Sequence, residues 1–334
     1  MSGSISGVGT RQRDGGRTRL VLSVLATVGA TGAVIALVAT NASDVGDALS
    51  MATVEQVSAL VLLHLVALVL RAESWGLCLD AAGAPVERRR LHSSSSLRFL
   101  ADTTVPTYIG AWVRIAILRR LGGDRAPTIG QMITADGTLL LVEAFITVGL
   151  LIACSILAGL SWYWPLLFLA LSAVALLAVT ALRRRFADRA WVRAFDVLSH
   201  ARHRVTLTVM LIFVLTIQPV RFWIALHAVG LDASALESLL AFVWTSVINA
   251  LPIGPGPASV GATVSVFGSE GIGAATASGL VLAATAFVAA GAYSIWGGLA
   301  LVRERREQER AASGRAAWHR GTSRTEAARP CSST

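Results

Sequence analysis

The sequence predicts an all-α polytopic membrane protein with about six full transmembrane helices and two re-entrant hairpins built from broken helices. Hydrophobic residues make up 54% of the 334 residues, and charged residues only 15%. Several apolar runs approach the ~20 residues that a helix needs to cross a bilayer. Arginines gather in a few polar segments between these runs, as they do in loops on the cytoplasmic side of a membrane.

The apolar runs define the spans and the domain organisation that we expect. The six expected spans are 20–40, 52–79, 128–157, 162–182, 205–229 and 274–302. They form a single transmembrane domain, 20–302, between an arginine-rich N-terminus, 1–19, and an arginine-rich tail, 303–334. We expect the tail to begin as a helix and to be largely disordered beyond it. The first run exceeds the ~7–15 apolar residues of a signal peptide, so we expect an uncleaved span.

The arginine distribution orients these spans. The chain has no lysine, so its formal net charge of +9 comes from arginine, concentrated in the N-terminus, 88–125, 183–204 and the tail. Connecting segments on the other side, such as 41–51 and 230–235, contain none. The positive-inside rule then predicts that both termini are cytoplasmic. We expect the protein to lie in the plasma membrane. Nucleic-acid binding is the weaker explanation of this charge, because the arginines form no single patch.

Two regions do not fit simple spans: 91–120 on the inner side and 235–269 on the outer side. Helix breakers lie near the middle of each region, namely Pro106 in the first and Pro252, Pro255 and Pro257 in the second. Proline removes a backbone donor and interrupts a helix, and each half has ~15–18 residues, which is short for a crossing. We therefore expect two re-entrant hairpins. Charge does not distinguish this arrangement from one with eight spans.

We interpret the two hairpins and the spans before them as an inverted repeat, about 52–157 and 205–302. The matched positions are Gly83, Pro106 and Gly110 in the first unit and Gly230, Pro252 and Gly256 in the second. The first spacing is 23 residues in one unit and 22 in the other, and the second spacing is four in both. Such folds place broken helices near the bilayer midplane, where freed backbone groups line a cavity. The alternative is a chance match in a chain rich in glycine and alanine.

Three motifs resemble those of a known family. They are "RAESWGLCLDAAG", "FLADTTVPTYIGAWVRIAILRR" and "NALPIGPG". Over 15–305 the chain resembles the lysylphosphatidylglycerol synthase transmembrane domain, or flippase-like domain, family, without the C-terminal aminoacyl transferase domain. The family usually has acidic residues where this chain has Ala111 and Ala262. The resemblance implies movement of a lipid with a charged headgroup, or of a lipid-linked precursor, between leaflets.

Charged side chains inside the spans are the candidates for a headgroup site. A charge at a helix centre costs about 2.5–3.5 kcal/mol on insertion scales, so such groups tend to face a cavity or a partner. We predict that the headgroup contacts are Arg114, Arg221, Arg71, Gly110 and Gly256. Arg114 follows the first break, where its guanidinium and free helix amides could face a phosphate.

Each of these arginines also has a structural alternative. Arg114 would anchor the first hairpin at the inner interface beside Arg119 and Arg120. Arg221 would pair with a membrane carboxylate. Arg71 would snorkel to the cytoplasmic end of its span.

Three intramembrane carboxylates complete the candidate site: Asp102, Asp136 and Glu143. Asp136 and Glu143 are seven residues apart and so share one helix face. They could pair with Arg98, Arg114 or Arg221, or take up protons during a transport cycle. Structural pairing is the preferred interpretation.

The motifs of most enzymes are missing. There is no cluster of His, Cys, Asp and Glu with metal-ligand spacing, and no nucleophile elbow or phosphate-binding loop. We therefore expect no metal, no cofactor and no catalysis. Two function hypotheses follow: a lipid translocator that binds an anionic headgroup, and a non-transporting membrane partner of a glycosyltransferase or lipid-modifying enzyme.

Overall fold

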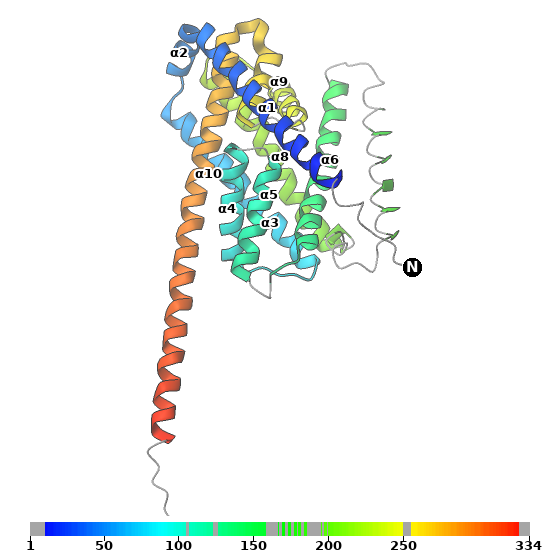
Figure 1. Ribbon diagram of the computed structural model, residues 1–334. Helices are drawn as coiled ribbons and strands as arrows, with labels where there is room; N and C mark the ends of the chain where they lie inside the picture. The colour runs from blue at the N-terminus through cyan, green and yellow to red at the C-terminus, as the bar shows by residue number, and fades with distance from the viewer. Residues whose placement is uncertain are drawn as a thin grey trace, which may run out of the picture.

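The regular structure in the computed structural model is helical throughout the residues that it describes (Figure 1). These residues are 11–104, 107–122, 126–157, isolated positions between 166 and 198, 200–249 and 255–326. The helices are α1 (Arg11–Thr40), α2 (Ala42–Ser50), α3 (Val54–Ala81), α4 (Arg88–Thr104), α5 (Thr107–Gly122), α6 (Ile129–Leu157), α8 (Ala201–Ala228), α9 (Ala235–Ile248) and α10 (Pro255–Glu326).

Four helices in the described part are long and apolar enough to cross a membrane. They are α3, α8, the segment Ile129–Ala153 of α6 and the segment Gly271–Arg303 of α10. They coincide with four of the expected spans. The first expected span lies in α1, which counts as a fifth candidate only together with α2, bent from it by 85°. The expected span 162–182 lies largely outside the described residues, so a total of six remains a prediction.

Helix α2 occupies a segment that the sequence analysis treated as a connection. Val45 and Ala48 are buried in the core, whereas Asp44 and Asp47 are exposed. Gly273 of α10 leaves room for the backbone of Asp44, whose carbonyl carbon would lie 3.1 Å from a Cβ at that glycine. The segment is therefore a short amphipathic helix that becomes recognisable only through the helix it packs on.

The first expected hairpin is present as a helix, a break and a helix. Helix α4 ends at Thr104, α5 begins at Thr107, and the two lie side by side (Figure 1). A Cβ at Gly110 would clash with the Asp102 carboxylate and lie 2.8 Å from the Arg98 carbonyl oxygen, so this glycine permits the close approach. Pro106, the predicted breaker, lies outside the described residues.

The second expected hairpin also has a break between two helices. Helix α9 ends at Ile248 and α10 begins at Pro255. Pro255 and Pro257 lie in the first turn of α10, after the break, where proline costs no helical hydrogen bond. Pro252 lies outside the described residues.

Helix α10 doubles back on itself at Gly271, which has a non-helical backbone. The Ser259 hydroxyl donates to the Gly279 carbonyl at 3.1 Å, and the Thr263 hydroxyl donates to the Ala275 carbonyl at 2.7 Å. These contacts make the two pieces antiparallel neighbours. The second piece then runs past α4 and continues beyond the bundle to Glu326 (Figure 1).

Small residues join α10 to the first hairpin. The four serines at 93–96 are fully buried. The Ser294 hydroxyl donates to the Ser96 carbonyl at 2.7 Å, and Gly297 leaves space for the Ser93 backbone. Small residues allow helices to approach closely in a membrane, so α10 connects the second break directly to the first hairpin.

Candidate functional site

One face of α3 carries His64, Arg71 and Trp75. The spacing of seven and then four residues places the three side chains along one helix face. The other side of α3 exposes apolar side chains such as Leu62 and Val66. We call the three residues the polar face of α3, and the other candidate residues lie on helices that pack against this helix.

Arg71 is held by Glu143 of α6 through two hydrogen bonds. Its Nε donates to Glu143 Oε1 at 2.9 Å, and its terminal nitrogen donates to Oε2 at 2.5 Å. Glu143 is 8% exposed, whereas the Arg71 side chain is 39% exposed. Arg71 therefore points inward to α6 and does not snorkel outward, which was its structural alternative. Glu143 makes a structural pair, as preferred, but with Arg71 and not with Arg98, Arg114 or Arg221.

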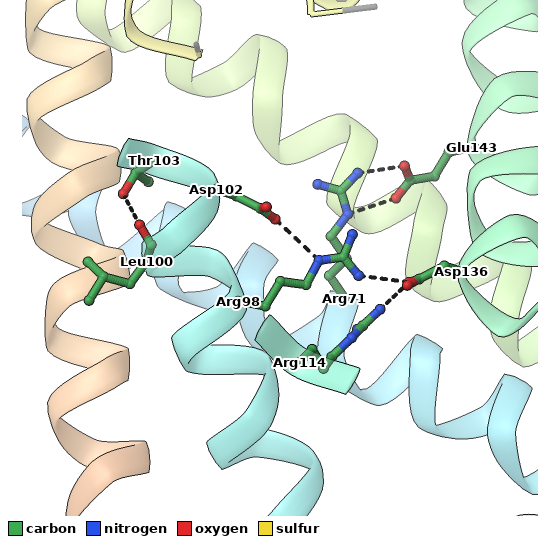
Figure 2. A network of polar contacts seen from close by, with 8 residues as sticks. All are labelled: Arg71, Arg98, Leu100, Asp102, Thr103, Arg114, Asp136 and Glu143. Atoms are coloured by element: carbon green, nitrogen blue, oxygen red, sulfur yellow. Dashed lines mark hydrogen bonds and ion pairs between the residues drawn. The ribbon is translucent and has the colours of Figure 1, made fainter. Parts of the chain in front are cut away.

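Asp136 of α6 joins the two helices of the first hairpin. Its Oδ1 accepts a hydrogen bond from Arg98 of α4 at 2.7 Å and a second, short one from Arg114 of α5. The predicted pairing of Asp136 with these two arginines is thus confirmed. The Nε of Arg98 also donates to Asp102 Oδ2 at 3.2 Å, while Asp102 Oδ1 has no hydrogen-bond partner (Figure 2).

Arg114 is the most deeply buried of these arginines, at 1% exposure. Its guanidinium carbon lies 3.5 Å from the centre of the Trp75 ring, so the polar face of α3 supplies a cation–π contact. Arg119 and Arg120, further along α5, are exposed. The description of Arg114 as an interfacial anchor beside them is therefore wrong.

These side chains form a charge-balanced cluster, which we call the charged network. Its members are Arg71, Arg98, Arg114, Asp102, Asp136 and Glu143 (Figure 2). Three guanidiniums face three carboxylates, so their formal charges cancel. Removing one partner of a buried pair costs about 3–5 kcal/mol because it leaves a charge without compensation. The charged network therefore holds α3, α4, α5 and α6 together whether or not it binds a ligand.

Arg221 of α8 has no such compensation. It is 4% exposed, and no Asp or Glu among the described residues lies within ion-pair distance. One terminal nitrogen donates to Gln218 Oε1 at 2.9 Å, the other approaches the Leu282 carbonyl at 3.4 Å, and Nε has no partner. The alternative in which a membrane carboxylate pairs with Arg221 is thus not observed in the described part of the chain.

The two glycines predicted to contact a headgroup have different surroundings. Gly110 is buried at the tightest point between α4 and α5. Gly256 lies in the first turn of α10, where an added Cβ would be an ordinary 3.8 Å from the Ala283 methyl. The structure therefore brings Gly110 to the charged network, through Asp102, and leaves Gly256 apart from it.

Sequence reasoning missed a hydrogen-bonded chain that links α3, α4 and α10. His92 Nε2 lies 3.0 Å from Glu73 Oε1, and His92 Nδ1 lies 2.5 Å from the Tyr293 hydroxyl. Trp296 stacks on Tyr293. These residues are up to 223 positions apart in sequence, so no local motif could have indicated the chain. Within the described residues, no group of three His, Cys, Asp or Glu side chains could hold a metal ion.

The comparisons with known proteins gave one match. A family model described as the lysylphosphatidylglycerol synthase TM region matches residues 20–297 of the 334. A search of curated proteins and a search of solved structures found no match. The matched range contains the whole charged network, Arg221 and both hairpins.

Proposed function

The chain belongs to the lysylphosphatidylglycerol synthase transmembrane family, and we propose that it moves an anionic lipid or lipid-linked precursor between the leaflets of the membrane. The chain is a multi-pass membrane protein of a lipid-related family. The observation that best supports transport is the line of polar groups along α3, inside the bundle. We propose no catalytic step on the lipid.

The polar face of α3 supplies a path of the right length for a headgroup. His64 and Trp75 are eleven residues apart, which is roughly 16 Å along a helix. This is about half of the ~30 Å hydrocarbon thickness. Arg114 covers the Trp75 end of the line. A headgroup that follows this line would exchange one polar partner for the next, while its acyl chains stay beside apolar side chains such as Leu62.

Arg71 is the arginine of the charged network best placed to exchange partners. It is the most exposed of the three, and its two parallel hydrogen bonds to Glu143 use the geometry that also suits a phosphate. We propose that a headgroup phosphate replaces Glu143 on Arg71 as the lipid passes. The carboxylate then holds the arginine in place between transport events.

The two broken hairpins would provide the movement. In the orientation that the arginines predict, the first enters from the cytoplasm and the second from outside, as in transporters built from inverted repeats. Such proteins rock one unit against the other around a site near the midplane. The close contact of α10 with α4 through Ser96 and Gly297 would couple the two hairpins.

A leaflet assay tests the proposal. The protein is reconstituted into vesicles with a fluorescent phosphatidylglycerol, and dithionite then reports which leaflet holds the fluorophore. We expect faster exchange than in vesicles without protein. The double variant Arg71→Gln/Glu143→Gln keeps shape and charge balance, and we expect it to slow exchange roughly tenfold, the effect of losing one charged hydrogen-bonding partner. Arg204→Gln, an exposed arginine on α8, is the matched control.

The opposite result would redirect the proposal. Wild-type protein that moves none of the anionic lipids tested, yet purifies with a glycosyltransferase or lipid-modifying enzyme, would support the non-transporting partner instead. A double variant that exchanges lipid at the wild-type rate would remove Arg71 from the path.

A further inference from the structure

Arg221 lies on the side of α8 that packs into the core. The neighbouring Val220 and Trp223 are exposed, whereas Arg221 and Phe222 are buried. Pro219 lies inside the helix two residues earlier and leaves a backbone carbonyl without its helical donor. A cation held among apolar side chains beside a helix irregularity, with no carboxylate in the described residues, is energetically costly unless it has a use.

His64 of α3 lies at the same level as Arg221. Helices α3 and α8 pack together, and the Ser74 hydroxyl approaches the Met210 sulfur at 3.7 Å. His64 precedes Ser74 by ten residues on α3, and Arg221 follows Met210 by eleven residues on α8. Because the two helices are antiparallel, both residues lie in the same direction from this contact, at roughly 15 Å along the helix axes. Leu60, one turn before His64, and Phe222, next to Arg221, lie in the same core cluster. The two side chains therefore belong to one neighbourhood.

Both side chains have a buried polar atom without a partner. Among the described residues, Arg221 Nε and His64 Nδ1 make no hydrogen bond. The arginine Nε–H is always a donor, and a neutral imidazole can carry its proton on Nδ1. Such atoms are rare in folded proteins and call for an explanation. Two donors beside one uncompensated positive charge form a site for an anion.

We propose that Arg221 and His64 form a second anion site, between α8 and α3, that binds a phosphate group carrying one negative charge. A monoanion balances the single guanidinium, whereas a dianion would leave a negative charge buried. The phosphodiester of a membrane lipid has this charge. The proposal rests on the proposed function in one respect, because it assigns this site to the lipid being moved. The site would hold the lipid phosphate at a second position along the transport path, separate from the charged network.

The position of the site fits such a stopping point. His64 is ten residues from the start of α3, and Arg221 is seven residues from the end of α8, so the site lies roughly 10–15 Å from that end of both helices. The predicted orientation puts these ends on the outer side. The charged network lies toward the other end of α3, so a phosphate would pass from Arg71 to Arg221 along the polar face.

Binding in detergent tests the site independently of transport. Delipidated protein in a neutral maltoside is titrated calorimetrically with diheptanoyl phosphatidylglycerol, and separately with inorganic phosphate. We expect Arg221→Gln to weaken binding roughly tenfold or more, and His64→Leu roughly three- to tenfold. His64→Asn, whose amide can donate from nearly the position of Nδ1, should bind within about threefold of wild type. Arg204→Gln should bind as the wild type does.

Each outcome decides a different point. If only the lipid binds with this pattern, the ligand is a lipid phosphate; if inorganic phosphate binds equally well, the site takes free phosphate. Wild-type affinity in Arg221→Gln for both probes would overturn the site, as would loss in His64→Leu that His64→Asn does not restore. Normal vesicle exchange in Arg221→Gln would show that the lipid being moved does not use this site, and would leave transport standing. If the variants show the expected binding pattern but the wild-type protein exchanges no lipid, the anion site stands and the proposed transport function is wrong.

Discussion

The first hairpin and the α8–α10 region each bury arginine, but they treat its charge in opposite ways. Around the first hairpin, Arg98 and Arg114 share Asp136, and the charged network has as many carboxylates as guanidiniums. Around α8, Arg221 has an amide and a backbone carbonyl as its only hydrogen-bond partners in the described part of the chain. The second hairpin lies beside the later piece of α10, and hydroxyl-to-carbonyl hydrogen bonds such as that of Thr263 join the two. No ion pair within the described residues joins its helices.

This difference separates arginines that stabilise the fold, among them Arg71, from one whose charge the described part of the protein leaves uncompensated. A compensated arginine stabilises the helices that it joins, because its removal strands a carboxylate. An uncompensated one makes folding less favourable, so its removal should not destabilise the bundle. Stability and transport measurements on matched variants can therefore test the comparison directly.

The largest effect should come from the centre of the charged network. Asp136→Ala removes the carboxylate that Arg98 and Arg114 share. Arg98 keeps Asp102, but the buried Arg114 loses its counter-ion, so we expect about 3–5 kcal/mol of lost stability. Thermal unfolding in detergent, followed by size exclusion, measures it. Asp47→Ala, an exposed aspartate on α2, should change stability by less than about 0.5 kcal/mol. A melting temperature of Asp136→Ala equal to that of wild type would show that the pairs do not hold the hairpin.

The two matched glycines should respond differently. Gly110→Ala places a methyl group against the Asp102 carboxylate and the Arg98 carbonyl, and we expect a loss of about 1–3 kcal/mol from overpacking. Gly256→Ala meets only an ordinary contact with Ala283 and should be neutral within about 0.5 kcal/mol. Equal melting temperatures for the two variants would contradict the close approach at Gly110.

Removal of Arg221 should have the opposite sign to removal of Asp136. Arg221→Met keeps the length of the side chain and removes a buried charge that has no carboxylate partner among the described residues. We expect stability to stay level or to rise by up to about 2 kcal/mol, less than the full cost of a buried charge because Gln218 and the Leu282 carbonyl are lost as partners. The same melting experiment measures it, and a large loss would mean that Arg221 has a structural partner after all.

The smallest effect concerns the start of α9, at the edge of the second hairpin. Ser234 and Glu237 form a capping box, and the hydrogen bonds from Ser234 hold the pKa of Glu237 below its usual value. A depressed folded pKa adds stability that is complete above the unfolded pKa and is lost as the pH falls through the folded pKa. We expect Ser234→Ala to cost about 0.5–1 kcal/mol near neutral pH and less in acid.

A melting-temperature profile against pH checks this expectation. Glu237→Gln keeps an acceptor but no longer titrates, so its profile should lack the acid-dependent part. A profile of Glu237→Gln that matches the wild type across the acid range would rule out the capping contribution.

Local features of the sequence predicted much of the fold. The apolar runs located α3, α6, α8 and the spanning part of α10, because crossing a bilayer needs a fixed length of apolar helix. The two breaks were located by their prolines and glycines. The shared face of Asp136 and Glu143 followed from helical spacing, and so did the pairing options of Asp136. The family motifs led to the family that the comparison then showed.

Predictions that depended on which helices are neighbours were weaker. The pairing of Arg71 with Glu143 was missed because the two residues are 72 positions apart, and hydropathy does not say that α3 lies beside α6. Helix α2 was missed because two buried side chains, Val45 and Ala48, are too few to predict an amphipathic helix from sequence alone. No local motif singles out His64, because its relation to Arg221 exists only across the α3–α8 contact.

By itself, the sequence determined the class of protein, most of its spanning helices and the places where helices break. Those properties follow from the solvent, because a bilayer requires each segment to be apolar and internally hydrogen-bonded along its own length. Tertiary structure alone decided which arginines have counter-ions. A charge is compensated only within a few ångströms. Helix register and rotation arise only when the helices pack, and they place Arg114 on Asp136 while no described carboxylate reaches Arg221.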